Sequence, residues 1–148
     1  MFGFFRKPQL PRDVEQKIIQ QIREAESGTS AEIRVHLNGP LKGKTPLEMA
    51  QLTFKKQGMH LTELRNGVLI FVSLKDRQFA IVGDSGIHQC VTDAFWNEVK
   101  SEMEQLFRNQ GPGEAICHGV KRAGEKLKQY FPAGNVNPNE LSDEISRS

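Results

Sequence analysis

One uninterrupted run of apolar residues stands out in the sequence, and it predicts the central strand of the fold. Residues 68–72 read Val-Leu-Ile-Phe-Val, which predicts a strand that is covered on both faces and central in its sheet. A second β-rich run at 78–82 follows residues 73–77, whose charges are typical of a hairpin loop. We therefore expect two antiparallel strands, with the polar residues at 66 and 84 meeting at one end of the pair.

An alternating pattern precedes this hairpin. Residues 31–37 place apolar side chains on one face and Glu32, Arg34 and His36 on the other, which predicts a half-buried strand at a sheet edge. A helix from Pro46 to about residue 57 should follow, with Thr45 as its cap. Strand, helix and strand in this order predict a right-handed βαβ unit with parallel strands.

Helical spacing of apolar residues predicts three further helices. They are expected at residues 13–26, 93–108 and 114–130. Trp96 falls on the inward stripe of the second with Val99 and Met103, so we expect it in the core. Beyond residue 132 the chain is polar, although Leu141 and Ile145 could hold it against the domain.

Together these elements predict the fold class. We expect one α/β domain, a small mixed β-sheet sandwiched by helices in an α/β/α arrangement. The architecture is Rossmann-like, but no GxGxxG follows a strand, so nucleotide binding is not expected. The expected boundaries are an N-terminal tail at 1–11, the domain at 12–132 and a C-terminal tail at 133–148.

Composition narrows the possible partners and compartment. The net charge is only +2, from 20 basic and 18 acidic residues, so nucleic acid is not an expected partner. The Phe-rich start of the chain is shorter than the apolar core of a signal peptide, and direct membrane insertion is not expected. Cys90 and Cys117 lack metal-ligand spacing and are expected to be reduced thiols. The expected location is the cytoplasm.

The sequence contains no established catalytic motif. There is no GxSxG, no phosphate-binding GxxxxGK[ST] and no HExxH. The four histidines are scattered one to an element and are expected to be surface or half-buried side chains. Ser85, His88 and Asp93 are close in sequence, which is poor evidence for a catalytic triad.

A candidate cation site lies where the two antiparallel strands end. Asn66, Asp84 and Asp93 offer amide and carboxylate oxygens beside glycines, and these are ligands that Ca²⁺ and Mg²⁺ prefer. We expect weak binding, with Arg65 projecting away from the cluster. The alternative is structural: Asn-Gly as a turn, Asp84 as a cap and Asp93 as a charge favoured in a first helical turn.

The other end of the hairpin carries charges of both signs. Asp76 and Arg77 lie in the loop, with Asn38 and the loop 42–44 expected nearby. The arginine and lysines could hold an anion. The alternative is a charged turn that keeps the sheet soluble, and it is the favoured interpretation.

Several motifs occur in order at consistent spacing. They are N-G-V-L-I-F-V from residue 66, a D-R turn, A-I-V-G-D-x-G-I from residue 80 and V-T-D-A-F-W from residue 91. The chain resembles the TPM domain family from about residue 31 to 131, with a similar tail at 139–145, and looks like a soluble bacterial-type member. Members commonly carry an acidic residue before the Asn-Gly; here Arg65 takes that place.

The resemblance implies an α/β/α sandwich and widens the functional expectations. Named relatives are a thylakoid-lumen protein linked to photosystem II repair and acid phosphatase activity, and a nematode modulator of acetylcholine receptors. The resemblance implies divalent metal near these motifs. We therefore expect a binding or accessory protein that binds Ca²⁺ or Mg²⁺ in an acidic cleft and associates with membrane-linked partner proteins. The alternatives are a metal-assisted acid phosphatase and a membrane-surface role for the Phe-rich N-terminus.

Overall fold

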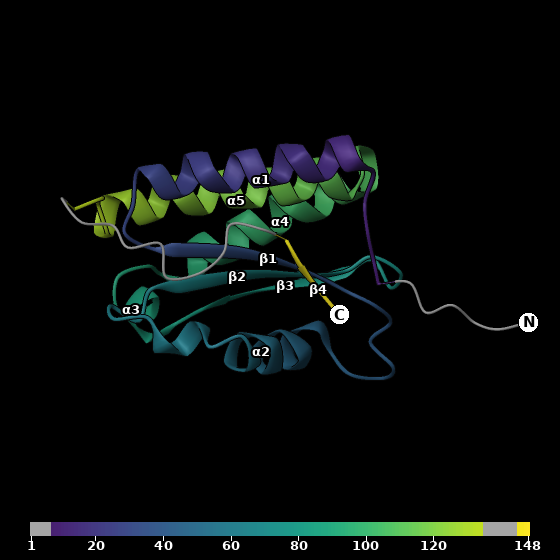
Figure 1. Cartoon of the computed structure of the whole chain (residues 1–148), viewed down its shortest axis with the longest axis horizontal. Coiled ribbons are helices and arrows are strands. Elements are labelled where there is room, and N and C mark those ends of the chain that lie inside the picture. The colour runs from purple at the N-terminus through teal and green to yellow at the C-terminus, as the bar shows by residue number, and fades with distance from the viewer. Residues whose placement is uncertain (1–6, 135–144) are drawn as a thin grey trace, which may run out of the picture.

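A computed structural model describes residues 7–134 and 145–148. A four-stranded sheet of order β3-β2-β1-β4 lies between two layers of helices (Figure 1). Helices α1, α4 and α5 cover one face and α2 covers the other, which confirms the predicted α/β/α class. The strands are β1 (Glu32–Asn38), β2 (Gly67–Ser73), β3 (Gln78–Gly83) and β4 (Ser146–Arg147). The helices are α1 (Arg12–Ser27), α2 (Pro46–Lys56), the 3₁₀ turn η1 (Met59–Leu61), α3 (Ser85–His88), α4 (Asp93–Asn109) and α5 (Pro112–Tyr130).

Strand β2 is central, as its apolar run predicts. All seven of its residues are buried. Val68, Ile70 and Val72 belong to the core cluster under α1, α4 and α5, whereas Leu69 and Phe71 belong to the cluster under α2. β2 pairs parallel to β1 and antiparallel to β3, which confirms both the βαβ unit and the hairpin.

Strand β1 is neither half-buried nor at an edge, so both of those predictions are wrong. β4 pairs along its outer side, and six of its seven residues are buried. On the face toward α2, the ring of His36 stacks on Phe71 and a guanidinium nitrogen of Arg34 donates to Gln57 at 2.9 Å. Burial lowers the pKa of His36 to about 4, so this imidazole is neutral near pH 7.

The helix signals were reliable where a side chain makes a local bond. The Thr45 hydroxyl accepts from the Glu48 N–H at 3.1 Å, which confirms the predicted cap of α2.

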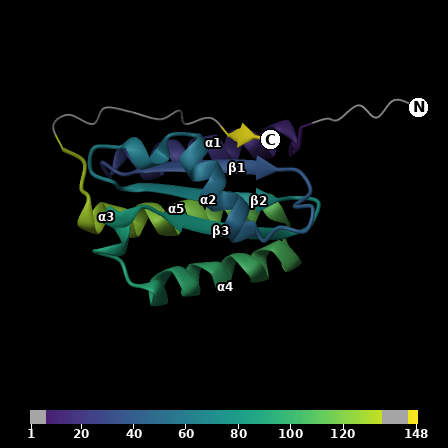
Figure 2. The same cartoon turned by 90° about the horizontal axis from the view of Figure 1, so that it is seen from below.

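Trp96 is only half-buried, contrary to prediction, and packs edge-on against Phe95. The reason is the position of α4 beyond β3, where the helix lies along the margin of the sheet (Figure 2).

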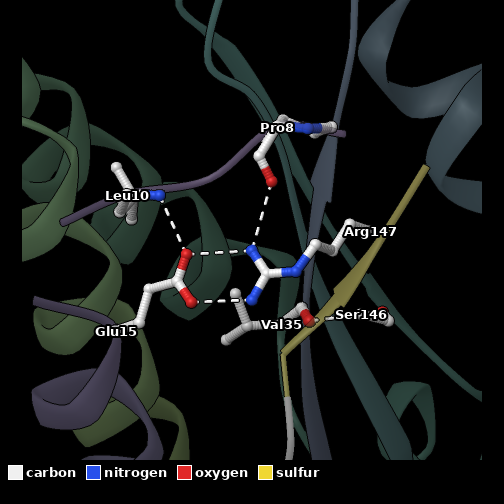
Figure 3. A network of polar contacts seen from close by, with 6 residues as sticks. All are labelled: Pro8, Leu10, Glu15, Val35, Ser146 and Arg147. Atoms are coloured by element: carbon white, nitrogen blue, oxygen red, sulfur yellow. Dashed lines mark hydrogen bonds and ion pairs between the residues drawn. The ribbon is translucent and has the colours of Figure 1, made fainter. Parts of the chain in front are cut away.

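The end of the chain returns to the domain and completes the sheet. Ile145 is buried in the core as expected, while Leu141 lies outside the described residues. Arg147 of β4 forms a two-pronged ion pair with Glu15 of α1, at 2.6 and 2.9 Å (Figure 3). It also donates to the Pro8 carbonyl, so one guanidinium joins the last strand, the first helix and the segment before it.

Two expectations about the surroundings can be compared with the described residues. No helix within 7–134 or 145–148 has the length and apolar character needed to span a bilayer. Cys90 and Cys117 are free and half-buried, and burial raises the pKa of Cys117. The Phe-rich residues 1–6 lie outside the described part of the chain.

The Glu15–Arg147 pair makes stability depend on pH. Hydrogen bonding from Arg147 lowers the pKa of Glu15 below its usual value of 4.5, despite the opposing effect of burial. Arg147→Gln should lower the free energy of unfolding by about 1–3 kcal/mol at neutral pH. The difference from wild type should shrink as the pH falls below about 4.5 through the lowered folded-state pKa, because the carboxylate is then protonated in both states.

Urea unfolding at about pH 7 and at about pH 2.5 measures this effect. Arg12→Gln, an exposed cation at the start of the same helix, is the matched control and should change stability by less than about 0.5 kcal/mol. An equal loss for Arg147→Gln at both pH values would contradict the assigned pair.

Candidate cation site

The candidate site is formed by two segments that are hydrogen-bonded together at the α3 end of the sheet (Figure 2). One segment enters β2 and the other leaves β3. The Asp84 N–H donates to the Gly67 carbonyl at 3.0 Å, and the Gly86 N–H donates to the Arg65 carbonyl at 2.9 Å. The antiparallel pairing therefore brings residues 66 and 84 to one place, as predicted.

Backbone requirements explain part of this sequence. A Cβ on Gly86 would lie 2.5 Å from the Leu64 carbonyl oxygen and 2.6 Å from that of Arg65, so only glycine allows the two segments to approach. Arg65 itself adopts the left-handed region, with φ at 52°. This conformation is uncommon for a residue with a side chain.

Arg65 points into the site, and the prediction that it projects away is wrong. Its Nε donates to Oδ2 of Asp84 at 2.8 Å and its Nη2 donates to Oδ1 at 2.9 Å. Oδ1 also accepts from the Ser85 N–H at 2.7 Å. The physical reason is burial: the Asp84 side chain is 7% exposed, and a carboxylate so far from water requires a counter-charge.

These contacts keep Asp84 ionised. Burial alone would raise the pKa of Asp84, but hydrogen bonds from Arg65 and from the Ser85 N–H outweigh it and hold the pKa below its usual value of 3.8. The charges of Arg65 and His60 also lower the pKa of Asp84. At neutral pH the site therefore contains a negative charge that an internal cation already neutralises.

The other two predicted ligands differ in their surroundings. Asn66 is 2% exposed, and its amide nitrogen lies 3.5 Å from the Ser30 hydroxyl. Asp93 is exposed at the first residue of α4. Within residues 7–134 and 145–148, no three His, Cys, Asp or Glu side chains gather as a metal site would require. The assignment of Asn66, Asp84 and Asp93 as cation ligands stays a prediction.

Two residues that the sequence did not single out also belong to this end. Thr62 is 4% exposed and its hydroxyl has no hydrogen-bond partner among the described residues; Nδ1 of His60 is likewise buried without one. His60 is near enough to influence the pKa of Asp84. Single polar residues in a turn carry no periodic signal, so their burial was not predictable.

At the opposite end, Asp76 serves the backbone. Its Oδ2 accepts from the Leu41 N–H at 2.7 Å and from the Ser73 hydroxyl at 3.3 Å. The carboxylate therefore ties the hairpin loop to the segment after β1. These contacts support the interpretation of this loop residue as structural.

The comparisons with known proteins identify the family. The fold and the site together define a class of protein. It is an α/β/α sandwich in which Asn-Gly stands at the start of the central strand and Gly-Asp at the end of its antiparallel partner. The TPM domain profile matches residues 9–126. The chain belongs to the TPM domain family.

Solved structures support this assignment. The BA42 protein of the psychrophilic bacterium Bizionia argentinensis is 34% identical, with a TM-score of 0.86 over 99% of each chain. The N-terminal domain of cg2496 from Corynebacterium glutamicum shares the fold at 16% identity and a TM-score of 0.65, covering 86% of this chain and 79% of that one. An N-terminal domain of a protein from P. gingivalis also shares the fold, at 16% identity and a TM-score of 0.69, covering 82% of this chain and 78% of that one. No match was found among functionally curated proteins.

The Arg65–Asp84 pair generates a stability prediction. Asp84→Asn should lower the free energy of unfolding by about 1–3 kcal/mol at neutral pH, because it removes a buried acceptor of three hydrogen bonds. Arg65→Gln should cost less than Asp84→Asn, because the guanidinium is 51% exposed and solvent screens its charge. Urea denaturation followed by circular dichroism measures both.

Asp93→Asn is the control for this comparison, since Asp93 is an exposed carboxylate on the next helix. It should cost less than about 1 kcal/mol. The Asp84→Asn loss should disappear as the pH falls through the lowered pKa of Asp84. A larger loss from Asp93→Asn than from Asp84→Asn would contradict the assigned roles.

Proposed function

We propose that this protein is a binding module of the TPM family that takes up Ca²⁺ or Mg²⁺ weakly at the Asn66–Asp84 end, in exchange for Arg65. The observation that carries the proposal is the Arg65–Asp84 ion pair. It places a guanidinium on both oxygens of a carboxylate that is ionised at neutral pH. A cation already occupies the position in which a metal ion would lie, and this makes weak binding the expected outcome.

The surroundings favour an exchangeable cation. Half of the Arg65 side chain is exposed, so the guanidinium is accessible to solvent while it pairs with Asp84. The Thr62 hydroxyl, three residues before Arg65, is a buried oxygen that lacks a partner within the described residues. Hard divalent cations prefer such oxygen sets, completed by water. Asp93, at the start of α4, is the second carboxylate of the proposed set.

A metal-assisted acid phosphatase is the competing function. Phosphoryl transfer of that kind depends on a dense carboxylate cluster or a positioned nucleophile. Asp84 is paired with Arg65, and the described residues contain no group of three or more His, Cys, Asp or Glu side chains that could hold a metal ion, which supports binding better than catalysis. Hydrolysis of p-nitrophenyl phosphate that is lost in Asp84→Asn and kept in Asp93→Asn would favour the enzyme instead.

Protein partners fit the same end of the molecule. Leu61 and Leu64 are 73% and 54% exposed and precede Arg65 by four residues and by one. Large exposed apolar side chains close to a charged site favour a protein surface as partner. We propose membrane-associated proteins as the partner class, on the resemblance to family members that act at membranes.

A cation titration tests the proposed function. We expect Ca²⁺ to shift NMR amide signals around residues 65–67 and 84–86 of the wild type with millimolar affinity. Arg65→Gln should bind about tenfold more tightly, because removing a competing charge at short range is worth about 1 kcal/mol or more. Asp84→Asn should abolish these shifts.

Asp93→Asn separates the two carboxylates and should weaken binding while leaving the fold intact. The hairpin carboxylate Asp76 serves as the internal reference, because its signals should not move. Shifts centred on Asp76, or equal affinity in wild type and Arg65→Gln, would show that the proposed site is the wrong one.

A further inference from the structure

A second surface, distinct from the proposed cation site, lies at the other end of the sheet. An open cleft of about 990 Å³ is bounded by the β2–β3 hairpin, the end of α4 and the start of α5. Figure 2 shows α4 ending at the hairpin end, opposite α3. The volume lies at the upper limit of the range typical of small-molecule sites.

The floor of the cleft is aromatic. Phe79 of β3 and Phe107 of α4 stack with ring centroids 5.1 Å apart and an interplanar angle of 27°. Leu10 and Leu74 extend this apolar surface and are half-buried. An apolar lining of this kind fits an aromatic ring or a short acyl chain.

The rim of the cleft is positively charged. Arg77, Lys100 and Arg108 line it and are exposed, and within the described residues none of the three forms an ion pair. Glu104 is the one acidic side chain in the lining. Neighbouring Asp76 forms no ion pair with Arg77 within the described residues, and its Oδ2 accepts from the Leu41 N–H and the Ser73 hydroxyl.

The backbone at Arg77 gives an independent indication. Its φ is 54°, a left-handed conformation that is unfavourable for residues with a side chain. Glycine or asparagine is the usual solution in such a hairpin. A long cationic side chain held there at a conformational cost is the kind of outlier from which a functional role is inferred.

We propose that this cleft binds an organic anion that combines an apolar ring or short acyl chain with a carboxylate or phosphate group. The apolar part lies on Phe79 and Phe107. The anionic group meets Arg77 and Lys100, and a guanidinium is suited to either acid group. A bare inorganic anion would make no contact with Phe79 and Phe107, and a neutral apolar molecule would form no ion pair with the cations of the rim.

The test compares three probes on the full chain: 2-naphthoate, neutral 2-naphthalenemethanol and inorganic phosphate. We expect 2-naphthoate to shift NMR amide signals of Arg77, Phe107 and Gly111. The other two probes should bind at least tenfold more weakly. Arg77→Gln and Lys100→Gln should each weaken naphthoate binding about fivefold, the effect of a single exposed ion pair near 1 kcal/mol.

Matched variants make the result decisive. Glu104→Gln removes the opposing charge and should strengthen naphthoate binding, whereas Lys121→Gln, an exposed lysine on α5 outside the cleft, should leave it unchanged. Asp84→Asn should also have no effect, so failure of this proposal is separate from failure of the cation site. Equal binding of the neutral alcohol, equal binding of phosphate, or naphthoate shifts outside the cleft would overturn the proposal.

Discussion

Burial of β2 on both faces is the constraint on which the rest of the structure depends. Each of its seven residues is buried, so helices must cover the sheet from two sides. The crossover between β1 and β2 supplies α2, and the remainder of the chain supplies α4 and α5 on the face of α1. Because residues 68–72 of β2 are all apolar, the polar side chains that flank this strand lie at its two ends.

Short-range patterns predicted the elements that form for local reasons. The apolar run of β2, the Thr45 cap and the hairpin follow from neighbours in the sequence. Strand β4 could not be predicted, because Ser146 and Arg147 have no β pattern and are held by pairing with β1 and by Glu15. The error about the edge position of β1 follows directly, since its edge is covered by a strand distant in sequence.

The candidate site shows the same division. The meeting of Asn66 and Asp84 follows from antiparallel pairing, which the sequence indicates. The direction of Arg65 does not, because it depends on a left-handed backbone and on the burial of the carboxylate that it contacts. Thr62 and His60 could not be recognised either, since burial of a single polar residue in a turn leaves no pattern in the sequence and His60 influences a carboxylate more than twenty residues away.

The two ends of the sheet differ in how their charges are balanced, and this difference determines which ligand each can take. At the α3 end, a buried carboxylate has its counter-charge built in through Arg65, so an added cation must compete with the protein. At the hairpin end, Asp76 is committed to the backbone and the exposed cations around the cleft have no comparable partner among the described residues. The net charge of +2 does not reveal this difference, because it is a sum over the whole chain and does not show that one end pairs its charges while the other has exposed cations. Position 65 is therefore decisive for the α3 end: an acidic residue there would leave the same carboxylate without its cation and make the whole end attract metal.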